Sequence, residues 1–214
     1  MKPDTALTAF ENWTLRVRPG MSKKIILLLH GWTGDEGSMS IFTRNFPDEY
    51  WLLSPRAPYP TMPSGFSWRA PAPRGSWPTV DLFRPSVESL IQLINHWSDA
   101  YSLDGYLFDV VGFSQGAALA FTLGLLHPER VRKIGILAGF APEGAEQLLT
   151  PGLLNGKNIF LAHGTLDEMV PISMARRTIK LLEDSGSKVT YCESEVGHKL
   201  SAECLRALES YLAN

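Results

Sequence analysis

The stretch Gly112-Phe113-Ser114-Gln115-Gly116 decides how the rest of the chain is interpreted. Residues 107–111, just before it, form an apolar run with the length and β-branched content of a buried strand. Residues 117–123, just after it, are helix formers that are apolar on every side, which predicts a buried helix. Glycines on both sides of the serine keep side chains out of the crowded strand-to-helix turn. The pattern predicts a nucleophile elbow, in which the Ser114 hydroxyl stands exposed above the end of a sheet.

Length and composition predict one domain that covers residues 1–214. The chain is 44% hydrophobic and 20% charged, which is ordinary for a globular protein, and its net charge of −2 argues against a nucleic-acid partner. Residues 1–13 lack the apolar segment of a secretion signal, and no apolar run reaches the roughly 18 residues of a membrane span. We therefore expect a cytoplasmic protein without a membrane span, and the sequence leaves a homodimer open.

Strands alternate with helices along the chain. Apolar or alternating runs predict strands at residues 14–18, 25–29, 51–54, 107–111, 131–137, 158–162 and 188–194. Helical patterns follow residue 38, Pro85, the elbow, Pro171 and residue 199. This order predicts an α/β fold with a mostly parallel sheet that helices cover on both faces. We expect residues 14–18 to form an edge or half-exposed strand. The connection at residues 139–157 is too short to fold as a separate cap domain, so we expect an open site.

The glycine-rich loop at residues 30–37 follows one of the buried strands. It lacks the lysine of a phosphate-binding loop and does not fit the dinucleotide fingerprint, so we expect no nucleotide cofactor. In hydrolases of this architecture, such a loop supplies one oxyanion donor and the residue after the nucleophile supplies the other. We therefore expect the amides of Trp32 and Gln115 to form the oxyanion hole, with Thr33 as a less favoured donor. We expect His30 to hold this loop through its imidazole without transferring a proton.

Residues 59–81 combine five prolines with interspersed aromatic side chains. Long loops are usually functional or disordered, and disordered segments are poor in aromatic residues. We therefore expect an ordered loop near the active site. Phe66 and Trp68, together with Met169, are the expected walls of an apolar substrate slot.

The two cysteines, Cys192 and Cys204, lack metal-ligand spacing. We interpret them as two reduced thiols in the core. The sequence predicts no metal site.

A serine hydroxyl needs a nearby base, and the base needs an acid that fixes its tautomer. Catalytic groups of an α/β sheet gather where strands end. Of the five histidines, His198 follows the last strand and fits the chain order serine, acid, histidine. Asp167 follows the preceding strand and is the favoured acid, while Glu168 and Glu195 are weaker alternatives. The predicted triad is Ser114, Asp167 and His198.

The chain resembles the carboxylesterase/phospholipase branch of the α/β-hydrolases, which includes small bacterial carboxylesterases and acyl-protein thioesterases. The matching pieces are Leu29-His30-Gly31, Pro55-Arg56-Ala57-Pro58, the elbow with Gln115, Gly65-Phe66-Ser67-Trp68, His163-Gly164-Thr165 with Asp167 and Val170-Pro171, and Gly197-His198. The resemblance implies an α/β-hydrolase fold, the same triad, and Trp32 and Gln115 as the oxyanion pair. Trp32 stands where the family often has a small apolar residue. Trp77 lacks the Phe-Asp pair that follows the corresponding tryptophan in the thioesterases, which weakens a prediction of acyl-protein specificity.

These features predict a serine carboxylic-ester hydrolase that needs no metal or organic cofactor. Its expected substrate is a small-molecule ester with a short to medium acyl chain. The alternatives are an acyl thioesterase or lysophospholipase, and a catalytically silent hydrolase scaffold that binds a ligand.

Overall fold

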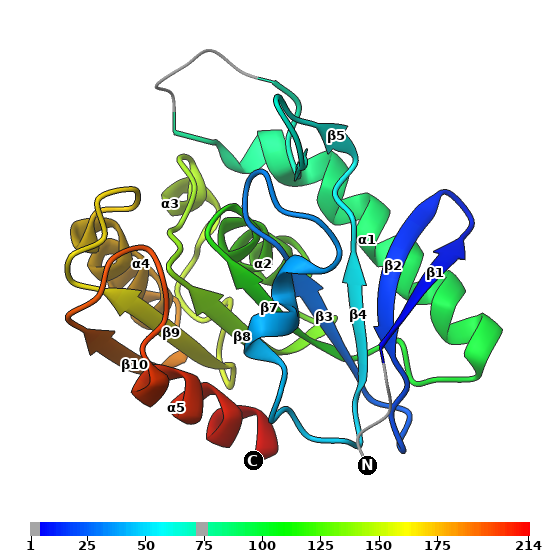
Figure 1. The fold of residues 1–214 in the computed structure, drawn as a ribbon. Helices are drawn as coiled ribbons and strands as arrows, with labels where there is room; N and C mark the ends of the chain where they lie inside the picture. Colours follow the sequence, from blue (N-terminus) through cyan, green and yellow to red (C-terminus); the bar gives the residue numbers. More distant parts are fainter. Residues whose placement is uncertain (1–4, 72–76) are drawn as a thin grey trace.

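The fold is built on a sheet whose strands run in the order β1-β2-β4-β3-β7-β8-β9-β10 (Figure 1). The computed structural model describes residues 5–71 and 77–214. The strands of this sheet are β1 (Ala6–Phe10), β2 (Trp13–Arg18), β3 (Ile25–Leu29), β4 (Trp51–Pro55), β7 (Phe108–Phe113), β8 (Val131–Leu137), β9 (Asn158–Gly164) and β10 (Lys188–Ser194).

Strand direction divides the sheet into two parts. From β4 through β10 every neighbouring pair is parallel, whereas β1–β2 and β2–β4 are antiparallel. Residues 14–18, predicted as an edge or half-exposed strand, form an interior strand, so the edge alternative is wrong. The half-exposed alternative holds, because Leu15 and Val17 are buried whereas Thr14 and Arg16 are partly exposed. Ala6–Phe10 forms a hairpin with β2 and takes the edge position. The central strand β3 reads Ile-Ile-Leu-Leu-Leu and is buried throughout, as expected for a strand covered on both faces.

Helices cover both faces of the sheet, as the sequence predicted. The helices are α1 (Val80–Tyr101), α2 (Gln115–Leu126), α3 (Ala145–Leu148), α4 (Ile172–Asp184) and α5 (Ala202–Ala213), with the 3₁₀ helix η1 at Ser38–Phe42. The core on one face contains side chains of α1, α2 and α4, and the core on the other contains side chains of η1 and α5. Figure 1 shows α5 in front of the sheet and α1 and α2 behind it. Each fully buried Leu, Ile or Phe contributes about 1.5–3 kcal/mol to these two cores.

Helix α1 begins earlier than the sequence predicted. Pro85 was expected to open it, but Thr79 caps it, with its hydroxyl accepting a hydrogen bond from the Leu82 N–H at 3.4 Å. Pro85 lies within the helix, where its missing N–H removes one backbone hydrogen bond. The threonine cap and Asp81 in the first turn stabilise the added turn.

Part of the expected loop at residues 59–81 forms a small hairpin. Its strands are β5 (Tyr59–Pro60) and β6 (Phe66–Ser67), and a single bridge joins Phe66 to Gly34. The hairpin therefore lies against the glycine-rich loop that follows β3. The predicted loop also includes residues 72–76, which lie outside the described residues.

Candidate active site

Ser114 lies between β7 and α2 with a backbone that few non-glycine residues adopt. Its φ is 54° and its ψ is −117°. A Cβ atom at Gly112 would lie 2.1 Å from the Gly116 carbonyl oxygen, and a Cβ at Gly116 would lie 2.1 Å from the Leu29 carbonyl oxygen. Both positions therefore require glycine because backbone passes too close for any side chain. This is the strained turn that the pentapeptide predicted.

His198 and Asp167 come together from the loops that follow β10 and β9. The His198 Nδ1 lies 2.7 Å from the Asp167 Oδ2, and the carboxylate is completely buried. The other oxygen, Oδ1, accepts hydrogen bonds from the N–H groups of Met169 and Val170, each at 2.9 Å. Because these two amides fix the carboxylate, Asp167 can in turn fix the orientation of the imidazole.

The imidazole of His198 lies beside the elbow. Its ring centroid is 5.0 Å from the ring centroid of Phe113, the residue before Ser114. Among the described residues no hydrogen bond joins the Ser114 hydroxyl to His198, and such bonds are often long in the absence of substrate. The structure thus brings the imidazole, the carboxylate and the elbow to one end of the sheet.

The alternative acids and the neighbouring histidine are placed differently. Glu168 and Glu195 are exposed, and in residues 5–71 and 77–214 neither forms a hydrogen bond or an ion pair. His163 is buried, and its Nε2 lies 2.8 Å from the Val170 carbonyl and 3.5 Å from the Asp167 Oδ2. Because its ring has no access to solvent, His163 positions the acid loop and cannot meet a substrate.

The two proposed oxyanion amides are open in the described part of the chain. The N–H groups of Trp32 and Gln115 have no hydrogen-bond partner there, whereas the Thr33 N–H donates to the Phe66 carbonyl at 3.0 Å. Thr33 is therefore already satisfied and is the poorer candidate. The Gln115 amide lies in the first turn of α2, where the positive end of the helix dipole also favours the binding of a negatively charged oxygen.

His30 ties the oxyanion loop to the loop after β4. Its Nδ1 lies 2.8 Å from the Gly31 carbonyl, and its Nε2 accepts a hydrogen bond from the Ala57 N–H at 3.1 Å. The ring is fully buried, and this burial lowers its pKa below the ordinary histidine value. His30 is therefore neutral at pH 7 and holds the loop, in keeping with the role expected from the sequence.

A second tie joins the same two loops through charge. The Arg56 guanidinium donates to both oxygens of Glu36, at 2.7 Å and 2.9 Å. This bidentate pair holds the pKa of Glu36 below its ordinary value. The Arg56 guanidinium also lies over the Phe66 ring, 4.7 Å from its centroid.

The side chain of Gln115 organises the hairpin next to the oxyanion hole. Its Oε1 accepts a hydrogen bond from the Trp68 N–H at 2.8 Å, and its Nε2 donates to the Ser67 hydroxyl at 3.1 Å. Sequence reasoning used Gln115 only for its amide and missed Ser67. The Gly-Phe-Ser-Trp segment carried the only signal, and it did not show which of its members contacts the elbow.

The three residues that were predicted to contact the substrate lie in different surroundings in the structure. Trp68 is completely buried, and its indole N–H donates to the His30 carbonyl at 2.8 Å. It therefore supports the oxyanion loop and does not line an open slot, which corrects the expectation for this residue. Met169 is 63% exposed and remains a predicted contact.

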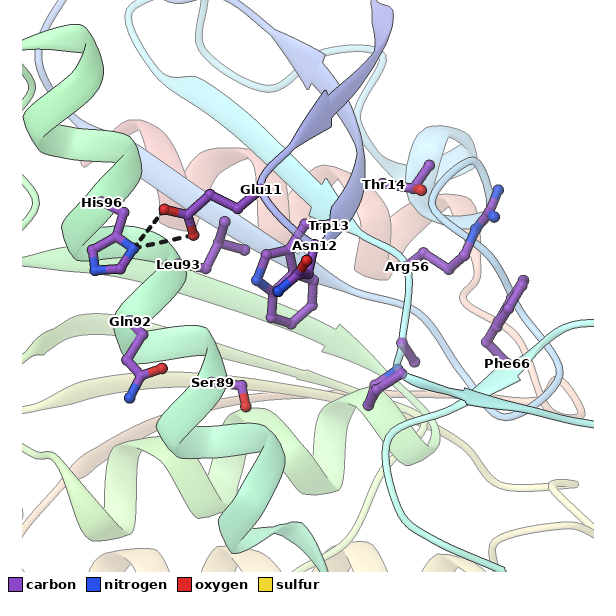
Figure 2. A pocket seen from close by; sticks show the side chains of 12 residues that line it. Glu11, Asn12, Trp13, Thr14, Arg56, Phe66, Ser89, Gln92, Leu93 and His96 are labelled. Carbon is purple, nitrogen blue, oxygen red and sulfur yellow. Dashed lines mark hydrogen bonds and ion pairs between the residues drawn. The ribbon is translucent and has the colours of Figure 1, made fainter.

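Phe66 lines a different cavity, of about 400 Å³, between the β1–β2 hairpin, α1 and the Arg56 segment (Figure 2). Figure 2 shows Glu11 and His96 facing each other across one end of it, where the carboxylate lies 2.9 Å from the His96 Nδ1. Neither Ser114 nor His198 lines this cavity. It is therefore not the cavity in which the proposed catalytic groups meet.

The two cysteines form a disulfide, which contradicts the interpretation of two reduced thiols. Cys192 lies in β10 and Cys204 in the first turn of α5, and the bond closes a loop with a sequence separation of 12. That loop contains His198. The spacing of the two cysteines indicates neither a metal site nor a pair, and the packing of α5 against β10 brings their sulfur atoms together.

The fold and the site define a class of protein. A mostly parallel sheet, a strained serine between strand and helix, and an acid and a histidine after the next strands are the features of an α/β-hydrolase. In the described part of the chain, no group of three or more His, Cys, Asp or Glu side chains could hold a metal ion. Nor does any helix there have the length and hydropathy needed to cross a bilayer.

Comparisons with known proteins place the chain within that class. A family model described as Phospholipase/Carboxylesterase matches residues 18–214, so the chain belongs to this hydrolase family, and the relatives found include carboxylesterases and acyl-protein thioesterases. The fold is similar to that of a carboxylesterase from Mesorhizobium loti, with a TM-score of 0.82 and 21% identity over 98% of this chain and 99% of that one.

Two relatives are similar in sequence. A probable carboxylesterase, SOBER1-like, from Arabidopsis thaliana is 28% identical over 218 residues, which cover 92% of this chain and 81% of the relative. Acyl-protein thioesterase 1 from Debaryomyces hansenii is 32% identical over 111 residues. The second match covers 51% of this chain and 47% of the thioesterase, so it spans about half the length of that relative.

Proposed function

We propose that this chain is a serine carboxylic-ester hydrolase. Ser114 is the nucleophile, His198 the general base and acid, and Asp167 the residue that orients His198. The observation that carries the proposal is the 2.7 Å contact between the His198 Nδ1 and the buried Asp167 carboxylate, beside the strained Ser114 backbone. Of the acidic side chains considered, Asp167 is the one that is both buried and held against a histidine next to the elbow.

The reaction proceeds through an acyl-enzyme. The Ser114 oxygen attacks the ester carbonyl while the His198 Nε2 takes the hydroxyl proton. The carbonyl oxygen becomes an oxyanion that accepts hydrogen bonds from the amides of Trp32 and Gln115, and loss of one such donor costs about 3 kcal/mol. The imidazolium then gives its proton to the leaving alcohol. Water, deprotonated by His198, attacks the acyl carbon. The bond to Ser114 then breaks, the imidazolium returns its proton to the serine oxygen, and the carboxylic acid leaves.

The proposed substrates are small esters with short to medium acyl chains. An exposed Trp32, at 59%, and an exposed Met169, at 63%, border the proposed site, and the α3 connection adds only a four-residue helix instead of a cap domain. A C2-to-C16 series of p-nitrophenyl esters tests this, since an optimum at C16 would contradict it.

The proposal requires no metal or organic cofactor, and a homodimer remains a prediction. A cytoplasmic setting also remains a prediction, and the disulfide counts against it because such bonds persist mainly in oxidising compartments.

An acyl thioesterase is the second candidate. The similarity to acyl-protein thioesterase 1 from Debaryomyces hansenii favours it, although the aligned part is about half of that protein. Comparison of kcat/KM for a matched thioester and oxyester decides between the two activities. Lysophospholipase activity belongs to the same test panel, with a lysophospholipid as substrate.

The decisive experiment replaces Ser114 by alanine. We expect hydrolysis of p-nitrophenyl butyrate to fall to near background, and labelling by a fluorophosphonate probe to disappear. Ser210→Ala, an exposed serine on α5, is the matched control and should leave both unchanged. Normal turnover by Ser114→Ala would refute the assignment. Failure of the wild-type protein to react with the probe would favour a silent ligand-binding scaffold.

A further inference from the structure

Beside the oxyanion loop lies a cavity of about 290 Å³ that the proposed chemistry does not yet use. The described residues that line it include the apolar or aromatic side chains of Trp32, Tyr59 and Met62, together with Ser67 and Arg69. Arg69 is the only charged residue among those lining residues, and no Asp or Glu is among them. As far as the described residues line it, the cavity is therefore mostly apolar and has one positively charged side chain.

The guanidinium of Arg69 has no partner in the described part of the chain. Its Nε is buried without a hydrogen bond, and no carboxylate lies within ion-pair distance. Arg56 and Arg132, in contrast, each donate two hydrogen bonds to one carboxylate, that of Glu36 and that of Asp109. Arg69 is partly buried: its Nε is covered, and its other two nitrogens are not among the buried atoms without a partner, so they are available to an anionic group.

The backbone that carries Arg69 is fixed to the oxyanion machinery. The Ser67 hydroxyl donates to the Arg69 carbonyl at 2.9 Å, and the same hydroxyl accepts a hydrogen bond from the Gln115 side chain at 3.1 Å. Trp32, whose amide is the other proposed oxyanion donor, lines the cavity itself. The cavity therefore adjoins the residue that carries one proposed oxyanion donor, although neither Ser114 nor His198 is among the described residues that line it.

We infer, on the basis of the proposed esterase function, that Arg69 selects esters that carry a carboxylate a few bonds from the scissile carbonyl. The planar guanidinium fork matches the two oxygens of a carboxylate. One cation balances the single charge of a carboxylate, whereas a phosphate dianion would require a second donor group of positive charge. The apolar walls accommodate the short chain between the two groups.

Two pairs of substrates test this inference and show on which side of the ester the carboxylate lies. Mono-p-nitrophenyl glutarate and p-nitrophenyl valerate differ by a carboxylate on the acyl side. The pair 4-acetoxybenzoate and 4-acetoxybenzamide differs by a carboxylate on the leaving-group side. We expect the wild-type ratio of kcat/KM, anionic over neutral, to fall by about 10- to 100-fold in Arg69→Gln for one of the pairs, because a charged hydrogen-bond pair is lost.

Matched variants separate charge from fold. Arg69→Lys keeps the charge without the fork, so it should retain part of the preference. Arg84→Gln removes an exposed arginine on α1 and should leave both ratios unchanged. If Arg69→Gln proves unstable in thermal melts, inhibition of the wild-type protein replaces it. Glutarate should then inhibit valerate hydrolysis at least tenfold more strongly than glutaramide.

The outcomes distinguish the inference from the function on which it rests. If the neutral esters are hydrolysed but neither ratio responds to Arg69→Gln, the role of Arg69 is refuted and the esterase proposal stands. Equal inhibition by glutarate and glutaramide refutes it in the same way. If none of the four esters is hydrolysed, the esterase proposal fails and the substrate inference fails with it.

Discussion

Replacement of Asp167 by asparagine changes the hydrogen bond to His198 and keeps the hydrogen bonds that this side chain accepts from the backbone. The Oδ1 of Asp167 accepts hydrogen bonds from the backbone N–H groups of Met169 and Val170, each at 2.9 Å. An asparagine oxygen would keep both bonds, because those donors are fixed in the backbone. Its NH₂ group then takes the place of Oδ2, against the His198 Nδ1.

The size of the effect follows from that exchange of an acceptor for a donor. A donor at this position forces the His198 Nδ1 to be unprotonated and moves the proton to Nε2, the nitrogen that must accept the serine proton. The carboxylate position is completely buried, so water cannot supply another acceptor. We expect kcat to fall about 10⁴-fold, which corresponds to about 5.4 kcal/mol at about 1.36 kcal/mol per factor of ten.

Initial rates on p-nitrophenyl butyrate measure this effect directly. Glu168→Gln and Glu195→Gln are the matched controls, because both residues are acidic neighbours that are exposed in the structure. Both controls should retain kcat within about twofold, and thermal melts should show that all three variants are folded. If Asp167→Asn keeps more than a tenth of the wild-type kcat, or if one of the controls loses as much, the proposed acid is wrong.

Two further predictions concern stability. Replacement of both Cys192 and Cys204 by serine removes a cross-link with a sequence separation of 12, which chain entropy values at about 3 kcal/mol. We expect calorimetry to show a Tm lower by about 6–12 °C, and an unchanged Tm would mean that the two thiols are not joined. Glu36→Gln should cost about 1 kcal/mol at pH 7, since it removes the charge that Arg56 binds. Because Arg56 holds the pKa of Glu36 below its ordinary 4.5, this contribution is complete above pH 4.5 and is lost as the pH falls further. Denaturant titrations should therefore show a smaller stability difference between wild type and Glu36→Gln at pH 3 than at pH 7, and an equal difference at both would refute the electrostatic reasoning.

Much of the fold could be predicted because its signals are local. The buried strand β3 is a continuous apolar run, β8 contains the buried residues Ile134, Ile136 and Leu137, and the structure has both strands at the predicted residues. The need for glycine at position 112 could be predicted for the same reason, since a Cβ there would lie 2.1 Å from the Gly116 carbonyl oxygen within the same strand-to-helix turn. The α/β-hydrolase fold is confirmed, whereas the roles of the individual site residues remain proposals.

Features that depend on distant partners could not be predicted. The strand Ala6–Phe10 has a weak pattern of its own and is ordered by its antiparallel neighbour β2. The disulfide requires α5 to pack so that Cys204 lies against Cys192, and the sequence around each cysteine does not indicate that contact. The burial of Trp68 was missed because an aromatic residue in a proline-rich loop can line a pocket or support a loop with equal ease. The hydrogen bond from the Trp68 indole to the His30 carbonyl indicates that Trp68 supports the loop.

The same dependence on distant partners determines the geometry of the proposed oxyanion hole. Three side-chain ties join residues 30–36 to residues 56–68: His30 to the Ala57 N–H, Glu36 to Arg56, and the Trp68 indole to the His30 carbonyl. None of these residues contacts a reacting atom in the proposed mechanism, yet together they fix the segment that carries the Trp32 amide. A misplaced amide loses a donor only in the transition state, where the oxyanion forms. Loosening one tie should therefore lower kcat more than it raises KM, and the loop after β4 positions a group of the active site without being part of it.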